Sequence, residues 1–158
     1  SLKTKVNSMK SEAVIVDVDG TLAQFNPTKV QQWVLGKEKQ WAPFFEHMST
    51  APAIDNVVKL VKMLKQQGQQ IIICSGRPDS YRQHTIAWLN KQSIPFDAIY
   101  LRPDGSDELN DEQVKDELLI NMNEDGFKPW LVLDDRDAVV AHWRKLGLTC
   151  LQCAPGDF

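Results

Sequence analysis

Short apolar runs alternate along the chain with segments in which apolar residues recur every three or four positions. The runs are rich in Val, Ile and Leu and predict β-strands, whereas the periodic segments predict amphipathic α-helices. In chain order, the predicted strands are AVIVDV, QIIICS, FDAIYL, WLVLDD and LTCLQC. The helices between them are IDNVVKLVKMLKQQG, SYRQHTIAWLNKQ, DEQVKDELLINM and DAVVAHWRKLG. Such continuous strands are typical of a parallel sheet covered on both faces, so we predict a Rossmann-like, doubly wound α/β fold.

Residues 26–50 interrupt this alternation between the first strand and the helix that follows it. The segment is rich in Trp, Phe and Gln, and we interpret it as a small cap inserted over the carboxyl edge of the sheet. Its aromatic side chains either stack on a nucleobase or pack the cap onto the sheet, and their large apolar area favours packing. These residues are Trp33, Trp41, Phe44, Phe45 and His47.

A length of 158 residues predicts one packed core and no second domain of ordinary size. We interpret residues 1–10 as linker or added residues and residues 11–158 as a single domain. No Gly/Pro/Ser-rich linker and no internal repeat divides this domain.

The composition, with 42% apolar and 25% charged residues, is that of an ordinary globular protein. No apolar run approaches the roughly 20 residues of a membrane helix, and no secretory signal opens the chain. The three cysteines lie in or beside apolar runs. This favours reduced core thiols in a cytoplasmic protein, in the host cytoplasm if a phage encodes it. The net charge of −3 argues against tight, nonspecific binding of long nucleic acid, although a short phosphorylated end remains compatible.

Polar residues stand where the predicted strands end. Because the carboxyl ends of parallel strands meet at one edge, where ligands bind, we expect these side chains to lie together. They are Asp17 and Asp19, then Ser75, Gly76 and Arg77, then Arg102, and finally Asp134 and Asp135.

Asp17 and Asp19 are two residues apart, so an extended backbone directs both carboxylates the same way. At a separation of about 4 Å they would repel by roughly 4 kcal/mol at an effective dielectric near 20. A cation relieves this repulsion, and all-oxygen ligands favour a hard ion such as Mg²⁺. No His or Cys joins the group, which disfavours zinc.

With a cation and a phosphate beside it, Asp17 is a candidate nucleophile toward phosphorus, forming an aspartyl-phosphate. Asp19 is then placed to protonate the leaving oxygen and later to deprotonate water. The alternative is that both residues only end a strand and bind its turn. Polar residues at the other strand ends, together with Lys115, favour a catalytic site.

In this combination and order, the motifs resemble those of the haloacid dehalogenase-like (HAD) phosphatases. Five stretches are similar to the 3′-phosphatase domain of phage polynucleotide kinase-phosphatases, from about residue 12 to the last residue. They are AVIVDVDGTLA, QIIICSGR, DEQVKDEL, LDDRDAVVAHWRKLGLTC and GDF.

The resemblance implies that Asp17 is the nucleophile and Asp19 the acid/base, with the Asp19 backbone carbonyl also on Mg²⁺. It implies that Thr21 and Ser75, with Gly76 beside it, bind the phosphoryl oxygens. Lys115 would stabilise the phosphate and the nucleophile.

The resemblance further implies that Asp134 is the third protein ligand to Mg²⁺ and that Asp135 supports it or Lys115. Arg77 matches a functionally required Arg that we place among the phosphate-binding residues, and Asp111 matches an acidic position that orients its partners. Arg102 has two interpretations from its place after the third strand. It binds a second phosphate or the substrate backbone, or it pairs with Asp104 or Asp107 of the acidic loop.

Two departures from the phage family stand out. An essential Arg after the first motif is replaced by NPTKV, in which Lys29 cannot supply the bidentate fork of Arg. The nucleotide-binding motif of the kinase half, GxxxxGK[ST], does not occur in the sequence.

We therefore expect a Mg²⁺-dependent phosphomonoesterase that removes 3′-phosphate from polynucleotide ends or nucleotides. Two alternatives remain: a 5′(3′)-mononucleotidase, and a module that binds nucleic-acid ends without turnover. The expected partners are a phosphorylated nucleotide or a short nucleic-acid end, together with a separate kinase or ligase.

Overall fold

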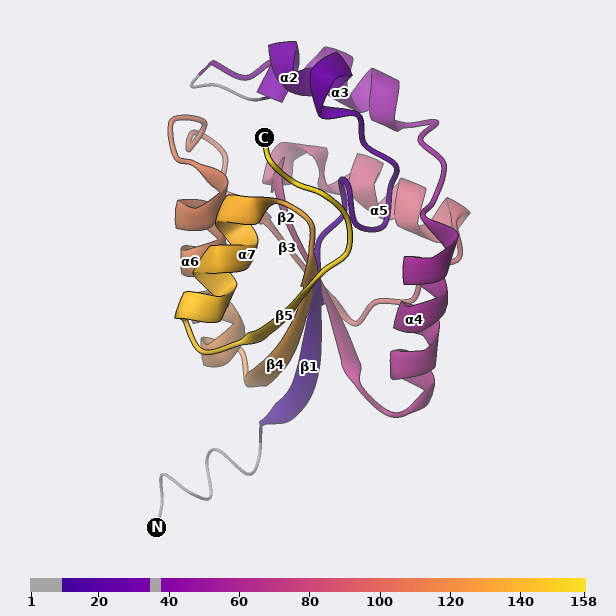
Figure 1. Ribbon diagram of the computed structural model, residues 1–158, viewed down its shortest axis with the longest axis vertical. Coiled ribbons are helices and arrows are strands. Elements are labelled where there is room, and N and C mark those ends of the chain that lie inside the picture. Colours follow the sequence, from indigo (N-terminus) through magenta and orange to yellow (C-terminus); the bar gives the residue numbers. More distant parts are fainter. Residues whose placement is uncertain (1–9, 35–37) are drawn as a thin grey trace.

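Five parallel strands form the centre of the molecule in this computed structural model (Figure 1). The structure describes residues 10–34 and 38–158; positions 1–9 of the expected linker at 1–10, and cap residues 35–37, lie outside the described residues. The order across the sheet is β3-β2-β1-β4-β5, which confirms the predicted doubly wound parallel sheet. The strands are β1 (Ser11–Val16), β2 (Gln70–Pro78), β3 (Ala98–Arg102), β4 (Phe127–Asp134) and β5 (Thr149–Gln152).

Helices cover both faces of the sheet. On one side lie α4 (Asp55–Gln66) and α5 (Arg82–Lys91), the latter preceded by the short 3₁₀ turn η1 (Asp79–Tyr81). On the other side lie α6 (Asp111–Glu124) and α7 (Asp137–Lys145). Side chains alternate along β1. Val14 and Val16 lie in the first core, between the sheet and α4 and α5, and Ala13 and Ile15 lie in the second core, between the sheet and α6 and α7. The two cores explain why the strands are apolar on both faces.

The cap consists of α2 (Pro27–Val34) and α3 (Trp41–Met48), which lie above the carboxyl edge of the sheet (Figure 1). Phe44 and Phe45 are only 2% and 5% exposed, and they join the core that contains Val16 of β1. Burial confirms the packing interpretation for these two rings.

The remaining buried groups agree with a packed interior. Cys74 and Cys150 are buried free thiols and Cys153 is half-buried, as expected for core thiols. Trp88 and Trp143 lie between helix and sheet. Within the described residues, no helix is long and apolar enough to cross a membrane.

Ile72→Ala tests the packing of the second core. Ile72 lies on β2, and its fully buried side chain packs in the core beneath α6 and α7. We therefore expect the free energy of unfolding to fall by about 2–5 kcal/mol. Urea titration with tryptophan fluorescence measures this loss. Met63→Ala is the control, because Met63 is 53% exposed and should change stability by only about 0.5 kcal/mol. Equal losses in the two variants would contradict the assigned core.

Candidate active site

Asp17 stands where β1 leaves the sheet. Its N–H still donates to the Leu133 carbonyl at 3.0 Å, which continues the pairing with β4. The chain then turns so tightly that the N–H groups of residues 21, 22 and 23 all donate to the Val18 carbonyl, at 3.2, 2.9 and 2.9 Å. This turn folds the Thr21 hydroxyl back over Asp17, where it donates to Oδ2 at 3.3 Å.

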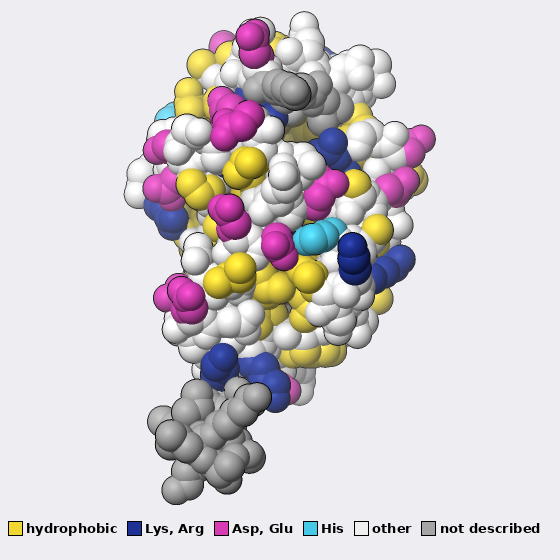
Figure 2. Space-filling view, turned by 90° about the vertical axis from the view of Figure 1, so that its left-hand side faces the viewer, with side chains coloured by type: hydrophobic (Ala, Val, Ile, Leu, Met, Phe, Trp, Pro, Cys, Tyr) yellow, Lys and Arg dark blue, Asp and Glu magenta, His cyan; other side chains and the backbone are white. Residues whose placement is uncertain are grey.

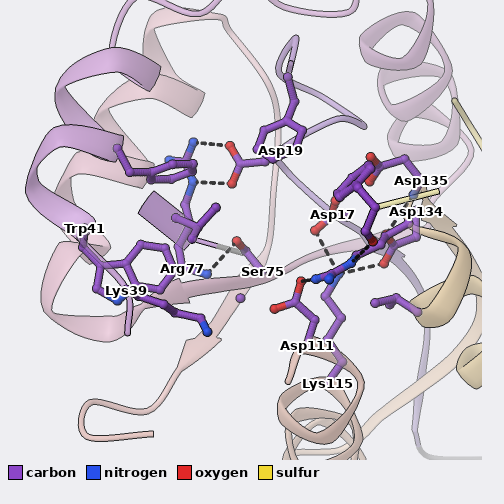
Figure 3. A pocket seen from close by; sticks show the side chains of 17 residues that line it. Asp17, Asp19, Lys39, Trp41, Ser75, Arg77, Asp111, Lys115, Asp134 and Asp135 are labelled. Atoms are coloured by element: carbon purple, nitrogen blue, oxygen red, sulfur yellow. Dashed lines mark hydrogen bonds and ion pairs between the residues drawn. The ribbon is translucent and has the colours of Figure 1, made fainter. Parts of the chain in front are cut away.

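Lys115 extends from α6 into the centre of the site (Figure 3). Its Nζ donates to Asp17 Oδ1 at 2.9 Å and to Asp134 Oδ2 at 2.7 Å. Burial by itself would lower the pKa of Lys115, but Asp134 and Asp17 outweigh it and raise this pKa well above its ordinary value. The ammonium group therefore stays charged and fixes the nucleophile candidate in place.

Asp134 and Asp135 at the end of β4 have different surroundings. Asp134 accepts hydrogen bonds on both oxygens, from Lys115 and Trp143 Nε1 (3.1 Å) on Oδ2 and from the Asp135 N–H (2.8 Å) on Oδ1. Asp135 accepts from the Thr21 hydroxyl at 3.3 Å. The carboxylate of Asp135 lies directly against Gly20, where any β-carbon would overlap with it.

A hard cation fits this group. Carboxylate oxygens of Asp17, Asp134 and Asp135 all lie within 4.8 Å of one another. Burial, and next the charge of Asp134, raise the pKa of Asp17 well above its ordinary value and that of Asp135 to about 6. These carboxylates are thus destabilised as anions, which a cation bound to oxygen ligands would relieve. The cluster includes Asp135, which the sequence predicted only as a supporting residue.

Asp19 turns its side chain away from this cluster and toward Arg77 (Figure 3). Arg77 Nε donates to Asp19 Oδ2 at 2.9 Å, and Nη2 donates to Oδ1 at 2.6 Å. Nη1 donates to the Thr85 hydroxyl at 3.2 Å. The structure thus directs Arg77 at the acid/base candidate, whereas the sequence had placed it among the phosphate-binding residues.

An irregularity in β2 produces this arrangement. Ser75 pairs with Leu101 and Pro78 with Arg102, so residues 76 and 77 have no opposite residues on β3 and bulge from the sheet. The Ser75 hydroxyl oxygen accepts the Arg77 N–H at 3.1 Å, which closes the bulge. The bulge brings both Ser75 and Arg77 to the pocket that contains Asp17.

Arg102 is fully buried and is not among the residues that line this pocket. It donates to the carbonyls of Gly76, Ser106 and Leu109, each at 2.8 Å, and to Asp111 Oδ1 at 3.0 Å. The guanidinium therefore holds the loop that follows β3, which differs from both of its sequence interpretations. The expected carboxylate partner was Asp104 or Asp107, but the one observed is Asp111, the first residue of α6.

Asp111 accepts from Arg136 as well, at 3.0 Å from Nη1 to Oδ2. Although burial raises the pKa of Asp111, the charges of Lys115, Arg136 and Arg102 prevail and hold this pKa below its ordinary value. Asp111 is therefore an ionised group that binds two arginines.

Aromatic and cationic side chains line the mouth of the pocket above Asp17. Trp41 and Lys39 reach it from the cap, and both bind Asp107: Trp41 Nε1 donates to Oδ1 at 3.1 Å and Lys39 Nζ to the carbonyl at 3.0 Å. On the opposite side, the Arg136 guanidinium lies 5.5 Å from the centre of the Phe158 ring. The further apolar lining residues are Phe25, Val34, Phe44 and Val139.

Some functional neighbours escaped the sequence analysis. Trp143 was assigned only to packing, but its indole N–H also binds Asp134. Arg136 and Phe158 lie within the matched motifs DDR and GDF and were passed over as individual residues. Lys29 is exposed and lies outside the residues that line the pocket.

The fold is that of the HAD phosphatases, the class that the sequence motifs resemble. Within this class, the chain belongs to the family of the polynucleotide kinase PNKP phosphatase domain, whose family model matches residues 11–158. The expected resemblance and the expected phosphatase class are thereby confirmed.

Solved structures agree with this family. A chain of the Pnkp1/Rnl/Hen1 complex is 31% identical, with a TM-score of 0.78 over 96% of this chain and 48% of that one. A chain of the Pnkp1/Rnl/Hen1 RNA repair complex is also 31% identical, with a TM-score of 0.77 over 94% and 44%. This chain thus spans about half the length of these two relatives. The class C acid phosphatase from Bacillus anthracis, at 18% identity, has a TM-score of 0.65 over 99% and 70%, a likeness in fold alone.

Gly20→Ala tests the contact between Gly20 and Asp135. A β-carbon would displace the Asp135 carboxylate, so we expect phosphatase activity to fall about 100-fold. Gly105→Ala is the matched control, because Gly20 and Gly105 have similar φ values of 88° and 80°. Both substitutions cost about 1–2 kcal/mol of backbone strain, but nothing lies within 4 Å of the added carbon at Gly105. Equal activity in the two variants, both folded by circular dichroism, would contradict the role of this contact.

Proposed function

We propose that the chain is a Mg²⁺-dependent phosphomonoesterase that removes 3′-phosphate from nucleic-acid ends through an aspartyl-phosphate. The observation that carries this proposal is the position of Asp17. Its buried carboxylate lines the pocket, bound by Lys115 on one oxygen and by Thr21 on the other. Such a fixed carboxylate needs no reorientation before it attacks phosphorus.

The proposed reaction has two steps. An oxygen of Asp17 forms a bond to phosphorus while the bond from phosphorus to the ester oxygen breaks, and Asp19 gives its proton to the leaving oxygen. Asp19 then takes a proton from water, whose oxygen attacks phosphorus while the bond to Asp17 breaks and inorganic phosphate leaves. The carboxylates of Asp17, Asp134 and Asp135 and the Asp19 backbone carbonyl would hold Mg²⁺, whose positive charge would offset the negative charge of the phosphoryl oxygens.

Other residues would hold the transferring group. The Ser75 oxygen accepts the Arg77 N–H and so keeps its own hydroxyl hydrogen for a phosphoryl oxygen. Thr21 and Lys115 are donors on the Asp17 side, and Gly76 lies between Ser75 and Arg77 where Asp111 leaves no room for a side chain. Arg102 would hold Gly76 in place, because it donates to the Gly76 carbonyl and is itself bound by Asp111.

The mouth of the pocket supports a nucleotide as the leaving group. Its aromatic rings offer stacking surfaces for a base, and Lys39 and Arg136 offer positive charge to a phosphodiester. The face formed by α6 and α7 carries acidic side chains interspersed with apolar ones, with Lys and Arg mainly toward its edges (Figure 2), which disfavours a long strand along its middle. Binding would then be concentrated at the end of the strand. The related chains of the RNA repair complex support the same substrate class. The 3′-hydroxyl product suits a separate ligase, with a kinase acting on the opposite end.

A mononucleotidase is the second candidate. The cap is tied to the loop at 103–110 through Asp107, and such a tied cap favours small, enclosed leaving groups.

A substrate panel separates the two candidates. We expect phosphate release with Mg²⁺ to be fastest from a 3′-phosphorylated oligonucleotide and slower from the 5′-phosphorylated oligonucleotide and from 3′- and 5′-mononucleotides. Chelation should stop release, and added Mg²⁺ should restore it. A preference for mononucleotides would support the mononucleotidase. Full activity in excess chelator would contradict the proposed requirement for Mg²⁺.

Asp17→Asn tests the nucleophile. The amide keeps the size of the side chain but cannot form the phosphoenzyme, so we expect kcat to fall at least about 10³-fold. Asp116→Asn is the control, because Asp116 is an exposed carboxylate on the same helix as Lys115 and pairs with His142. An Asp17→Asn protein with undiminished turnover would exclude Asp17 as nucleophile.

A further inference from the structure

Arg77 connects the candidate acid/base to the cap. Its side chain is 3% exposed, and the fork of its guanidinium is engaged by both oxygens of Asp19. The guanidinium carbon lies 5.0 Å from the centre of the Phe45 ring and 5.6 Å from that of Phe44. The carboxylate of Asp19 and the two aromatic rings of α3 therefore both hold the guanidinium.

The two rings are themselves held in place. Phe45 stacks on Tyr81 with ring centres 4.2 Å apart and planes at 3°, and Tyr81 belongs to the η1 turn just beyond β2. Phe44 meets Phe45 edge to face, with centres 5.3 Å apart. The contact thus joins the cap to the sheet edge through the same residues that surround Arg77.

We propose that the aromatic pair Phe44 and Phe45 positions the acid/base Asp19, acting through Arg77. This inference rests on the proposed function, in which Asp19 transfers the proton. A carboxylate has about four acceptor positions, and the bidentate bridge occupies two of them. The remaining positions are available for the transferred proton or for water, while the bridge sets the direction in which they point.

This geometry distinguishes positioning from phosphate binding. Arg77 binds a carboxylate with its Nε and Nη2 face, the same face with which Arg would bind a phosphate in bidentate fashion. Loss of the rings should therefore affect the proton transfer and leave attack on phosphorus almost intact. The two effects are separable, because only a poor leaving group needs the proton.

Phe45→Leu is the test variant. Phe44 lines the active-site pocket, whereas Phe45 does not, so an effect of Phe45→Leu does not come from lost contact with the substrate. The substrates are benzyl phosphate, whose leaving alkoxide requires a proton, and p-nitrophenyl phosphate of similar size, whose leaving phenolate does not. The measured quantity is kcat/KM, which covers the steps through transfer to Asp17 and excludes the later attack by water.

We expect Phe45→Leu to lower kcat/KM for benzyl phosphate about tenfold or more and to change that for p-nitrophenyl phosphate by less than about twofold. Phe45→Tyr keeps a ring over Arg77 and should preserve the wild-type ratio. Trp33→Leu is the control in the same cap: Trp33 contacts His47 and should not change the ratio of the two substrates. If Phe45→Leu does not fold, Arg77→Lys, which keeps the charge but loses the fork, should show the same selective loss.

The outcomes distinguish a failure of the positioning role from a failure of the proposed function. Equal losses on both substrates, or no loss on either, in the folded variant would overturn the positioning role. Asp19→Asn measured with the same pair should show the selective loss if Asp19 is the acid. Absence of this loss in Asp19→Asn would reject the proposed function itself, whereas its presence there and absence in Phe45→Leu would reject only the role of the aromatic pair.

Discussion

Lys115 places one positive charge among buried carboxylates, and the rest of the site depends on it. Without this charge, Asp17 and Asp134 would have no cationic side chain paired with them among the described residues, and a buried anion that lacks one costs several kcal/mol. The start of α6 sets its position: Asn110 and Gln113 form a reciprocal capping box at the first turn. The helix thereby delivers Lys115 to the end of β1 in one geometry.

The same helix start organises the surroundings of the pocket. Asp111 binds both Arg102 and Arg136. Arg102 holds the loop after β3, and Arg136 holds the last residue, because its Nε donates to the Phe158 carbonyl at 2.8 Å. That loop holds the cap through Asp107. A substitution at the start of α6 would therefore disturb the position of Asp17, the mouth of the pocket and the cap together.

The sequence predicted the fold and the polar edge well because both depend on local pattern. Apolar runs that end abruptly in Asp17 and Asp134 are readable without knowledge of tertiary contacts. The destinations of the arginines are not, because the Arg77 fork reaches Asp19 only through the bulge in β2, and Arg102 turns to loop carbonyls that no periodicity reveals. The bond from Trp143 to Asp134 likewise requires α7 to cover the end of β4.

The central claim is that Asp17 carries the phosphoryl group during turnover. Its most direct test is mass spectrometry of the Asp19→Asn protein, quenched in acid after mixing with Mg²⁺ and p-nitrophenyl phosphate, whose phenolate leaves without a proton from Asp19. Asp19→Asn should slow attack by water and let the intermediate accumulate, with one phosphate on the peptide that contains Asp17. Phosphate on another residue, or p-nitrophenolate released in a single turnover without any phosphorylated peptide, would contradict the role of Asp17.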